Sequence, residues 1–330
     1  METHVPSKRT RLSYIFVTVI KCQEARGQVC SLNNYPTFRS IKRSFAQIGS
    51  KLLLQVKIMK RDDGSVSTSR KNSESKMLYL LAFFSAVSLT VIYFFMAHSD
   101  FLPFFSSLSR PVVAGVSLLA SGLALRHYWE SLESALSRIW LCFTIGMAFW
   151  FLSELGWAFQ TLILNMPNPY PSIANVYRLV GYGALFLSIF VYLGLFRNVI
   201  SGKIVAISAA VTLPTSAGII PSILLLARGK MSTMNFATFF VTIAYPLFDL
   251  LLFAQAMFGL LVFTITGLKG RVKGAWLLLN AGILMNVFGD LLLSYTNLSG
   301  IYYQGHPLEL FFHAGYIFFA LAFYAHTKEL

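Results

Sequence analysis

The feature that most constrains the fold is a series of eight apolar runs between Met77 and Leu330. Each run has about 20 residues, the length with which an α-helix crosses the hydrocarbon core of a bilayer. We place the runs at residues 77–96, 111–127, 139–164, 173–196, 204–227, 236–266, 275–296 and 307–326. Hydrophobic residues make up 56% of the chain and charged residues only 12%. The sequence therefore predicts an all-α integral membrane protein with eight transmembrane helices.

The segment before the first span, residues 1–76, differs from the rest of the chain. It holds 15 of the 27 Lys and Arg residues and 5 of the 13 Asp and Glu residues. A basic chain can bind nucleic acid, but basic residues beside membrane spans are typical of cytoplasmic tails, so we predict no nucleic-acid partner. We expect a disordered N-terminal tail, followed by a membrane domain at 77–330. The composition favours an extension ahead of a translation start at Met59 or Met77, and the alternative is a tail attracted to anionic membrane lipid.

The charges of the connecting loops predict the orientation. With the N-terminus inside, eight Lys and Arg residues lie at inner loops and ends, whereas four lie at outer ones. The outer four are Arg110, Arg178, Arg228 and Lys230. Because cytoplasmic loops carry the excess of positive charge, we predict a multi-pass protein of the cell membrane with both termini in the cytoplasm.

The two halves of the membrane domain, about 77–200 and 201–330, resemble each other at an offset near 136 residues. This offset matches Trp140 with Trp276 and Glu154 with Asp290. A unit of four spans returns the chain to its starting side, so both copies share one orientation. The pattern predicts two parallel four-helix repeats related by an axis along the membrane normal.

Ionisable residues inside the spans are candidates for a function, because a charge in the bilayer core costs several kcal/mol. Glu154 lies in the third span with Trp157 on the same helix face, and Asp249 lies in the sixth. Asp290 lies in the seventh span, four residues after Asn286. All three acids fall in the outer half of the bilayer in the predicted orientation.

The eighth span adds a polar stripe, in which the residues recur every three or four positions and therefore share a helix face. The stripe consists of His306, Glu309, His313 and Tyr316. Three interpretations of the intramembrane polar residues remain open. They hydrogen-bond between helices, or they form one outward-facing pocket for a ligand or for protons, or Asp290, His306, Glu309 and His313 bind a metal for hydrolysis.

The spacing of these residues matches no recognised zinc motif, and Cys22, Cys30 and Cys142 lack metal-binding spacing. We therefore predict no metal and no cofactor. The fifth span holds Pro214 and Pro221, which indicate either an ordinary kinked membrane helix or a broken helix beside a binding cavity.

Several motifs resemble the multi-span sensory module found at the N-terminus of bacterial and archaeal diguanylate cyclases, phosphodiesterases and histidine kinases. The matching positions are Glu154, Pro171, Ser172, Ala174, Tyr177, Gly181, Tyr182, Tyr245, Pro246, Asp249, Gly289 and Asp290. Asn175 stands where that family usually has Asp. The resemblance covers residues 110–326 and implies a sensory function. Because the chain ends at Leu330 without an output domain, such a sensor would need a separate output protein.

A second, shorter resemblance is to the lysoplasmalogenase-type family of eight-span membrane hydrolases. It rests on FGDLLLSY followed by FFHAGY. It implies Asp290 as the catalytic acid, with His313 and Tyr316 lining the site.

We predict a non-enzymatic sensory or ligand-binding membrane module. The alternatives are a lipid hydrolase of this second type and a small-solute transporter. The candidate ligand-binding residues are Glu154, Trp157, Asp249, Asn286, Asp290, His306, Glu309, His313 and Tyr316.

Overall fold

The structure is a computed structural model that describes most of the chain from Ser67 to Glu329. The described residues are 67–96, 99, 101–129, 134–166, 170–198, 200–228, 235–265 and 271–329. Most of the predicted tail, residues 1–66, lies outside them. By its contacts the chain divides into two units, and the membrane domain corresponds to the unit Ser75–Leu330.

All regular elements of the described residues are α-helices, and eight of them are long and apolar enough to cross a membrane. They are α3 (Ser67–Phe95), α4 (Phe101–Arg126), α5 (Ala135–Leu162), α6 (Ile173–Leu195), α7 (Gly202–Arg228), α8 (Phe236–Ile265), α9 (Arg271–Ser299) and α10 (Glu309–Glu329). The predicted all-α fold with eight spans is confirmed, and the chain is a polytopic membrane protein.

The second span begins ten residues earlier than the sequence predicts. α4 starts at Phe101 instead of Pro111, and Pro111 lies inside it. The added turns contain Ser106 and Ser107, which are buried and hydrogen-bonded to Glu309 and Gln304. The hydroxyl groups of these serines face polar partners in the bundle, so the polar segment is accommodated within the helix.

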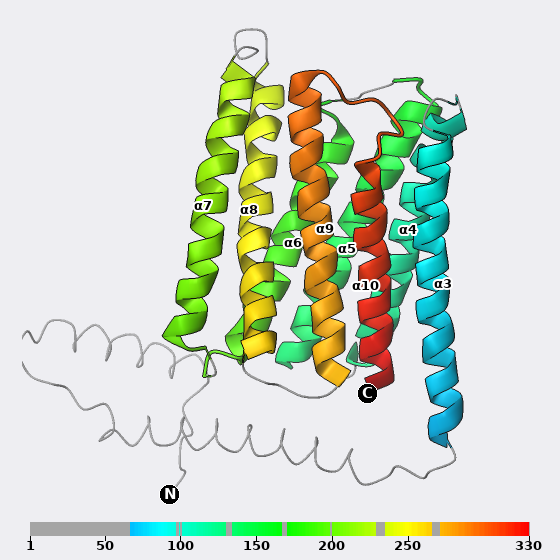
Figure 1. Cartoon of the computed structure of the whole chain (residues 1–330), viewed down its shortest axis with the longest axis vertical. Helices are drawn as coiled ribbons and strands as arrows, with labels where there is room; N and C mark the ends of the chain where they lie inside the picture. The colour runs from blue at the N-terminus through cyan, green and yellow to red at the C-terminus, as the bar shows by residue number, and fades with distance from the viewer. Residues whose placement is uncertain are drawn as a thin grey trace, which may run out of the picture. The chain divides into compact units, whose positions relative to one another are not determined.

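Six helices form a closed ring, in which each helix packs on the next (Figure 1). The order around the ring is α4, α5, α6, α8, α9, α10 and back to α4. Between 39% and 50% of the residues in the apolar windows of these helices are buried, against 6% for α3 and α7. α3 and α7 are therefore peripheral helices, at opposite sides of the bundle in Figure 1.

Two helix pairs in the ring approach closely through glycines. Gly146 of α5 faces Gly181 of α6, and Gly282 of α9 faces Gly315 of α10. A Cβ atom at Gly146 would lie 3.3 Å from the Gly181 carbonyl oxygen, and one at Gly315 would lie 3.0 Å from the Gly282 carbonyl oxygen. Small residues of this kind allow membrane helices to pack with their backbones in contact. The pairing is compatible with the internal repeat, which stays a prediction.

The prolines of the fifth span do not break it. Pro214 and Pro221 both lie inside α7, which runs as one helix from Gly202 to Arg228. α7 packs on α8 and α9 from outside the ring. Of the two interpretations of these prolines, the structure favours the ordinary membrane helix.

Candidate functional site

Two arginines and two carboxylates form a buried ion network inside the ring. Arg178 of α6 donates to Glu154 of α5 at 3.0 Å and to Asp290 of α9 at 2.7 Å. Arg110 of α4 pairs with the other oxygen of Glu154 at 2.8 Å. None of the four residues is more than 7% exposed. Two positive and two negative charges balance each other, as buried charges require.

Two tyrosines complete this network. Each bonds an acid that lies in the opposite half of the membrane domain. Tyr316 of α10 donates to Glu154 of α5 at 2.9 Å. Tyr182 of α6 donates to Asp290 of α9. The acid of the first half of the chain, Glu154, is therefore bonded to a tyrosine of the second half, and Asp290 of the second half to a tyrosine of the first. The hydrogen bonds hold the two halves against each other at this level of the bundle.

The guanidinium groups also lie over aromatic rings. Arg178 is 4.5 Å from the ring centroid of Trp150, and Arg110 is 4.6 Å from that of Phe312. Cation–π contacts of this kind are strongest when the cation is shielded from water. The rings thus add to the stabilisation of the buried cations.

Two further candidate residues join the network at its edge. Tyr182 contacts Asp249 of α8 at 2.5 Å, in addition to its bond with Asp290. Asn286 accepts a 3.4 Å hydrogen bond from Arg178 and donates to the Gly282 carbonyl. Asp249 and Asn286 therefore lie beside the ions, but neither lines the cavity described next.

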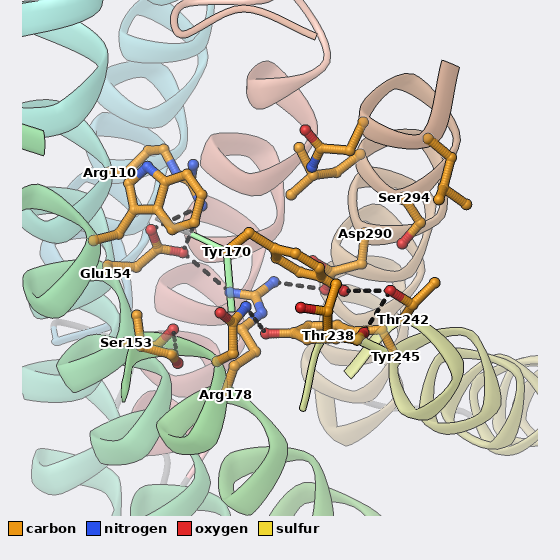
Figure 2. Close-up of a pocket in the computed structure, with 16 residues that line it drawn as sticks. Arg110, Ser153, Glu154, Tyr170, Arg178, Thr238, Thr242, Tyr245, Asp290 and Ser294 are labelled. Carbon is orange, nitrogen blue, oxygen red and sulfur yellow. Dashed lines mark hydrogen bonds and ion pairs between the residues drawn. The ribbon is translucent and has the colours of Figure 1, made fainter. Parts of the chain in front are cut away.

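A cavity of about 240 Å³ opens beside the ion network (Figure 2). It is lined by Arg110, Ser153, Glu154, Trp157, Tyr170, Ala174, Asn175, Arg178, Thr238, Thr242, Tyr245, Asp290, Leu293, Ser294, Asn297 and Leu298. Apart from Arg110 of α4 and Tyr170 of the loop before α6, these residues lie toward the C-terminal ends of α5 and α9 and the N-terminal ends of α6 and α8. In the predicted orientation, this is the outer end of the bundle.

The wall of the cavity includes two arginines and the tyrosine Tyr170. The Nε atoms of Arg110 and Arg178 are enclosed by protein atoms and have no hydrogen-bond partner among the described residues. Tyr170, in the loop before α6, hydrogen-bonds Thr242 at 3.2 Å across the cavity. Burial raises the pKa of Tyr170, so its hydroxyl group stays protonated at neutral pH.

A second polar cluster is centred on Glu309, at the start of α10. Its carboxylate accepts hydrogen bonds from the hydroxyl groups of Tyr93, Ser106 and Tyr302 and from the backbone N–H of Gly305. Burial raises the pKa of Tyr302 well above its usual value, which keeps this donor protonated. The position at the N-terminus of α10 also favours a negative charge on Glu309.

His313 belongs to the Glu309 cluster and is separated from Asp290. Its Nδ1 atom bonds the Glu309 carbonyl at 2.9 Å, and its Nε2 atom bonds Ser109 at 2.8 Å. It lines a groove between α3, α9 and α10, whereas Asp290 lines the cavity. Since no hydrogen bond joins the two residues in the described part of the chain, the geometry does not support their joint action in a hydrolase.

His306 lies in the loop before α10, although the sequence places it on the helix face. Its Nδ1 atom accepts from the Leu308 backbone N–H at 3.2 Å, and its ring contacts Tyr303. Partial burial lowers the pKa of His306. Within residues 67–329, as far as they are described, no three His, Cys, Asp or Glu residues are grouped to hold a metal ion. The metal interpretation of Asp290, His306, Glu309 and His313 therefore has no geometric support.

The prediction missed Arg110 and Arg178 as members of the site, because it counted both among the outer loops and ends. The structure places Arg110 inside α4, nine residues after its start at Phe101, and Arg178 in the second turn of α6. The signal was present in the sequence, since each deep carboxylate needs a cation or several donors nearby. Without these two arginines, Arg228 and Lys230 remain as the outer charges.

Comparison with the models of known protein families, with curated proteins and with solved structures finds no match to this chain.

Proposed function

We propose that this protein is a membrane receptor module that binds a small polar molecule in the cavity beside Arg178. The observation that carries the proposal is the position of the ion network, which lines the cavity and also joins the two halves of the ring. Glu154, Arg178 and Asp290 line the cavity, and each bonds a residue of another helix. A ligand that contacts them competes with bonds that hold helices together.

The mechanism is a change in the packing of the two halves. An occupied cavity favours whichever arrangement of the halves gives the ligand the better contacts, and ligand binding shifts the equilibrium by that difference in affinity. We propose that a separate output protein detects this change. The resemblance to sensory modules supports this proposal, since the motif residues Tyr182, Asp249 and Asp290 lie in direct contact.

The chemistry of the cavity indicates what kind of molecule it accepts. The guanidinium groups of Arg110 and Arg178 in the cavity wall favour a ligand with an oxygen acceptor, because hydrogen bonds from a charged donor are stronger than those from a neutral one. Trp157 and Tyr170 offer aromatic surface. A volume of about 240 Å³ accommodates a molecule of the size of an amino acid or a small aromatic acid.

Binding can be tested by thermal unfolding of the full chain in lipid nanodiscs, in the presence of amino acids, short carboxylic acids and hydroxylated aromatic compounds. We expect at least one compound to raise the unfolding temperature of the wild type. The variant Ser294→Leu, which fills the cavity, should lose this effect. Ser222→Leu, on the exposed surface of peripheral α7, should keep it. A compound that stabilises wild type and Ser294→Leu equally would contradict binding in the cavity.

A further inference from the structure

Asp249 differs from the other buried acids of the bundle. Glu154 and Asp290 form ion pairs with arginines, and Glu309 accepts four hydrogen bonds. Asp249 is fully buried but forms no ion pair, and its one hydrogen-bonding contact is with Tyr182 among the residues described. A bare carboxylate in such a place would carry a large desolvation cost.

The hydrogen atoms between Asp249, Tyr182 and Asp290 can be counted. The Tyr182 oxygen lies within hydrogen-bond distance of one carboxylate oxygen of each aspartate. A tyrosine hydroxyl group has a single proton and can donate to only one of them. The other contact would bring two oxygen lone pairs together unless that carboxyl group carries a proton of its own.

The surroundings decide which aspartate carries this additional proton. The Asp290 oxygen that contacts Tyr182 also accepts a 2.7 Å bond from Arg178, an arrangement typical of an ionised carboxylate. Asp249 has no such cation, and its second oxygen has no hydrogen-bond partner among the described residues. A neutral carboxylic acid leaves a carbonyl oxygen there in place of a bare charged oxygen, which lowers the cost of burial.

We infer that Asp249, Tyr182 and Asp290 form a proton-binding site, in which Asp249 holds a proton and donates it to the Tyr182 oxygen. Tyr182 in turn donates its own proton to Asp290. Every short contact of the triad then contains one hydrogen atom. With Asp249 neutral, the charges of Arg110, Arg178, Glu154 and Asp290 also balance.

The charged groups around Asp249 come from the helices that pack on α8. α6 contributes Tyr182 and Arg178, and α9 contributes Asp290. α7 carries Lys203 and Arg228 near its two ends. Asp290 belongs to both the triad and the cavity, so two hydrogen bonds, through Tyr182, connect the carboxyl group of Asp249 with the cavity wall.

Infrared spectroscopy of the full chain in lipid nanodiscs at neutral pH tests this site. We expect a carbonyl band of a protonated carboxyl group in the wild type. The band should shift to lower frequency when aspartate is labelled with ¹³C at its carboxyl carbon, because the proton is on an aspartate. It should disappear in Asp249→Asn and persist in the matched variant Glu309→Gln.

Three results would overturn the inference: no such band in the wild type, a band insensitive to the aspartate label, or a band retained in Asp249→Asn. The first two need no variant, so the test remains decisive even if a variant fails to fold. It also needs no ligand, and its outcome is therefore separate from that of the binding experiment proposed above.

Discussion

At the scale of the residue, the described part of the bundle buries four carboxyl groups in three different ways. Glu154 and Asp290 share Arg178, Glu309 is surrounded by hydroxyl and N–H donors, and Asp249 is left with one tyrosine. Because the charged residues of the network share counter-ions, the loss of one residue affects the stability of the others. Arg110 forms its one ion pair within the described residues with Glu154, so the loss of Glu154 leaves a buried cation without an anion.

This dependence predicts strong coupling between Arg110 and Glu154. Glu154→Gln should lower the free energy of unfolding by about 3–5 kcal/mol, because it leaves the buried cation of Arg110 unpaired. Arg110→Gln should cost less, because Glu154 keeps its ion pair with Arg178. The double variant should lose clearly less than the sum, since it removes both charges. The measurement is equilibrium unfolding in detergent micelles. Simple additivity of the two losses would show that the pair is not coupled.

His306 predicts a weak dependence of stability on pH. The folded state lowers its pKa, and Nδ1 must be unprotonated to accept from the Leu308 N–H. The neutral ring therefore stabilises the protein fully above the unfolded pKa of about 6.5, and this stability is lost as the pH falls through the folded value. His306→Asn keeps an acceptor that does not titrate. We expect thermal unfolding between pH 7 and pH 5 to depend less on pH in this variant; an equal dependence would refute the assignment.

At the scale of the element, the sequence could predict the properties of single helices but not the contacts between helices. Length and hydropathy are properties of one run of residues, so they identify each membrane span without its neighbours. The partner of a polar side chain is a property of two helices. Arg178 looks like an end charge because it follows a loop closely, yet Glu154, Asp290 and Tyr316 cover it from three other helices.

Helical periodicity predicted only part of the arrangement of polar residues in the last span. It predicted a shared face for His306, Glu309 and His313, and Glu309 and His313 do contact each other through a hydrogen bond to the backbone. His306 falls outside, because α10 begins only at Glu309. The free-energy cost of a buried charge was enough to identify the acids as candidates. Their contacts with Arg178 could be found only from the arrangement of the helices in the ring.

The close contact of α9 with α10 predicts that two glycines of α9 tolerate an alanine differently. A Cβ atom at Gly282 would lie 2.7 Å from the Phe319 ring and 2.9 Å from the Gly315 carbonyl oxygen. We expect Gly282→Ala to cost about 1–3 kcal/mol, the usual penalty for overpacking. Gly274→Ala on the same helix meets nothing within 4 Å and should be neutral or slightly stabilising, since alanine favours the helix. Thermal unfolding of both variants gives the comparison; equal effects would contradict close packing at Gly282.

At the scale of the whole molecule, the closed ring explains how charges persist inside an apolar bundle. Each ring helix contacts two ring neighbours, so a side chain pointing inward meets several other helices and no lipid. Aromatic side chains fill one part of this interior, where the ring centroids of Trp140 and Trp276 are 5.8 Å apart. Glu154 and Asp290 lie 14 residues further along the same helices, about 21 Å at 1.5 Å per residue. The polar site is thereby confined to one end of the bundle, and the function depends on which side of the membrane that end faces.

The loop charges predict that this end faces outward, and cysteine labelling in intact cells can decide it. Tyr303, in the exposed loop between α9 and α10, marks the cavity end, and Ser201, between α6 and α7, marks the opposite end. In a background with Cys22, Cys30 and Cys142 replaced by serine, Tyr303→Cys should react with a membrane-impermeant maleimide. Ser201→Cys should react only after the cells are permeabilised, because Arg197 and Lys203 beside it belong to the inner, positively charged side. The reverse pattern would place the cavity on the cytoplasmic side, and the ligand would then be an intracellular solute.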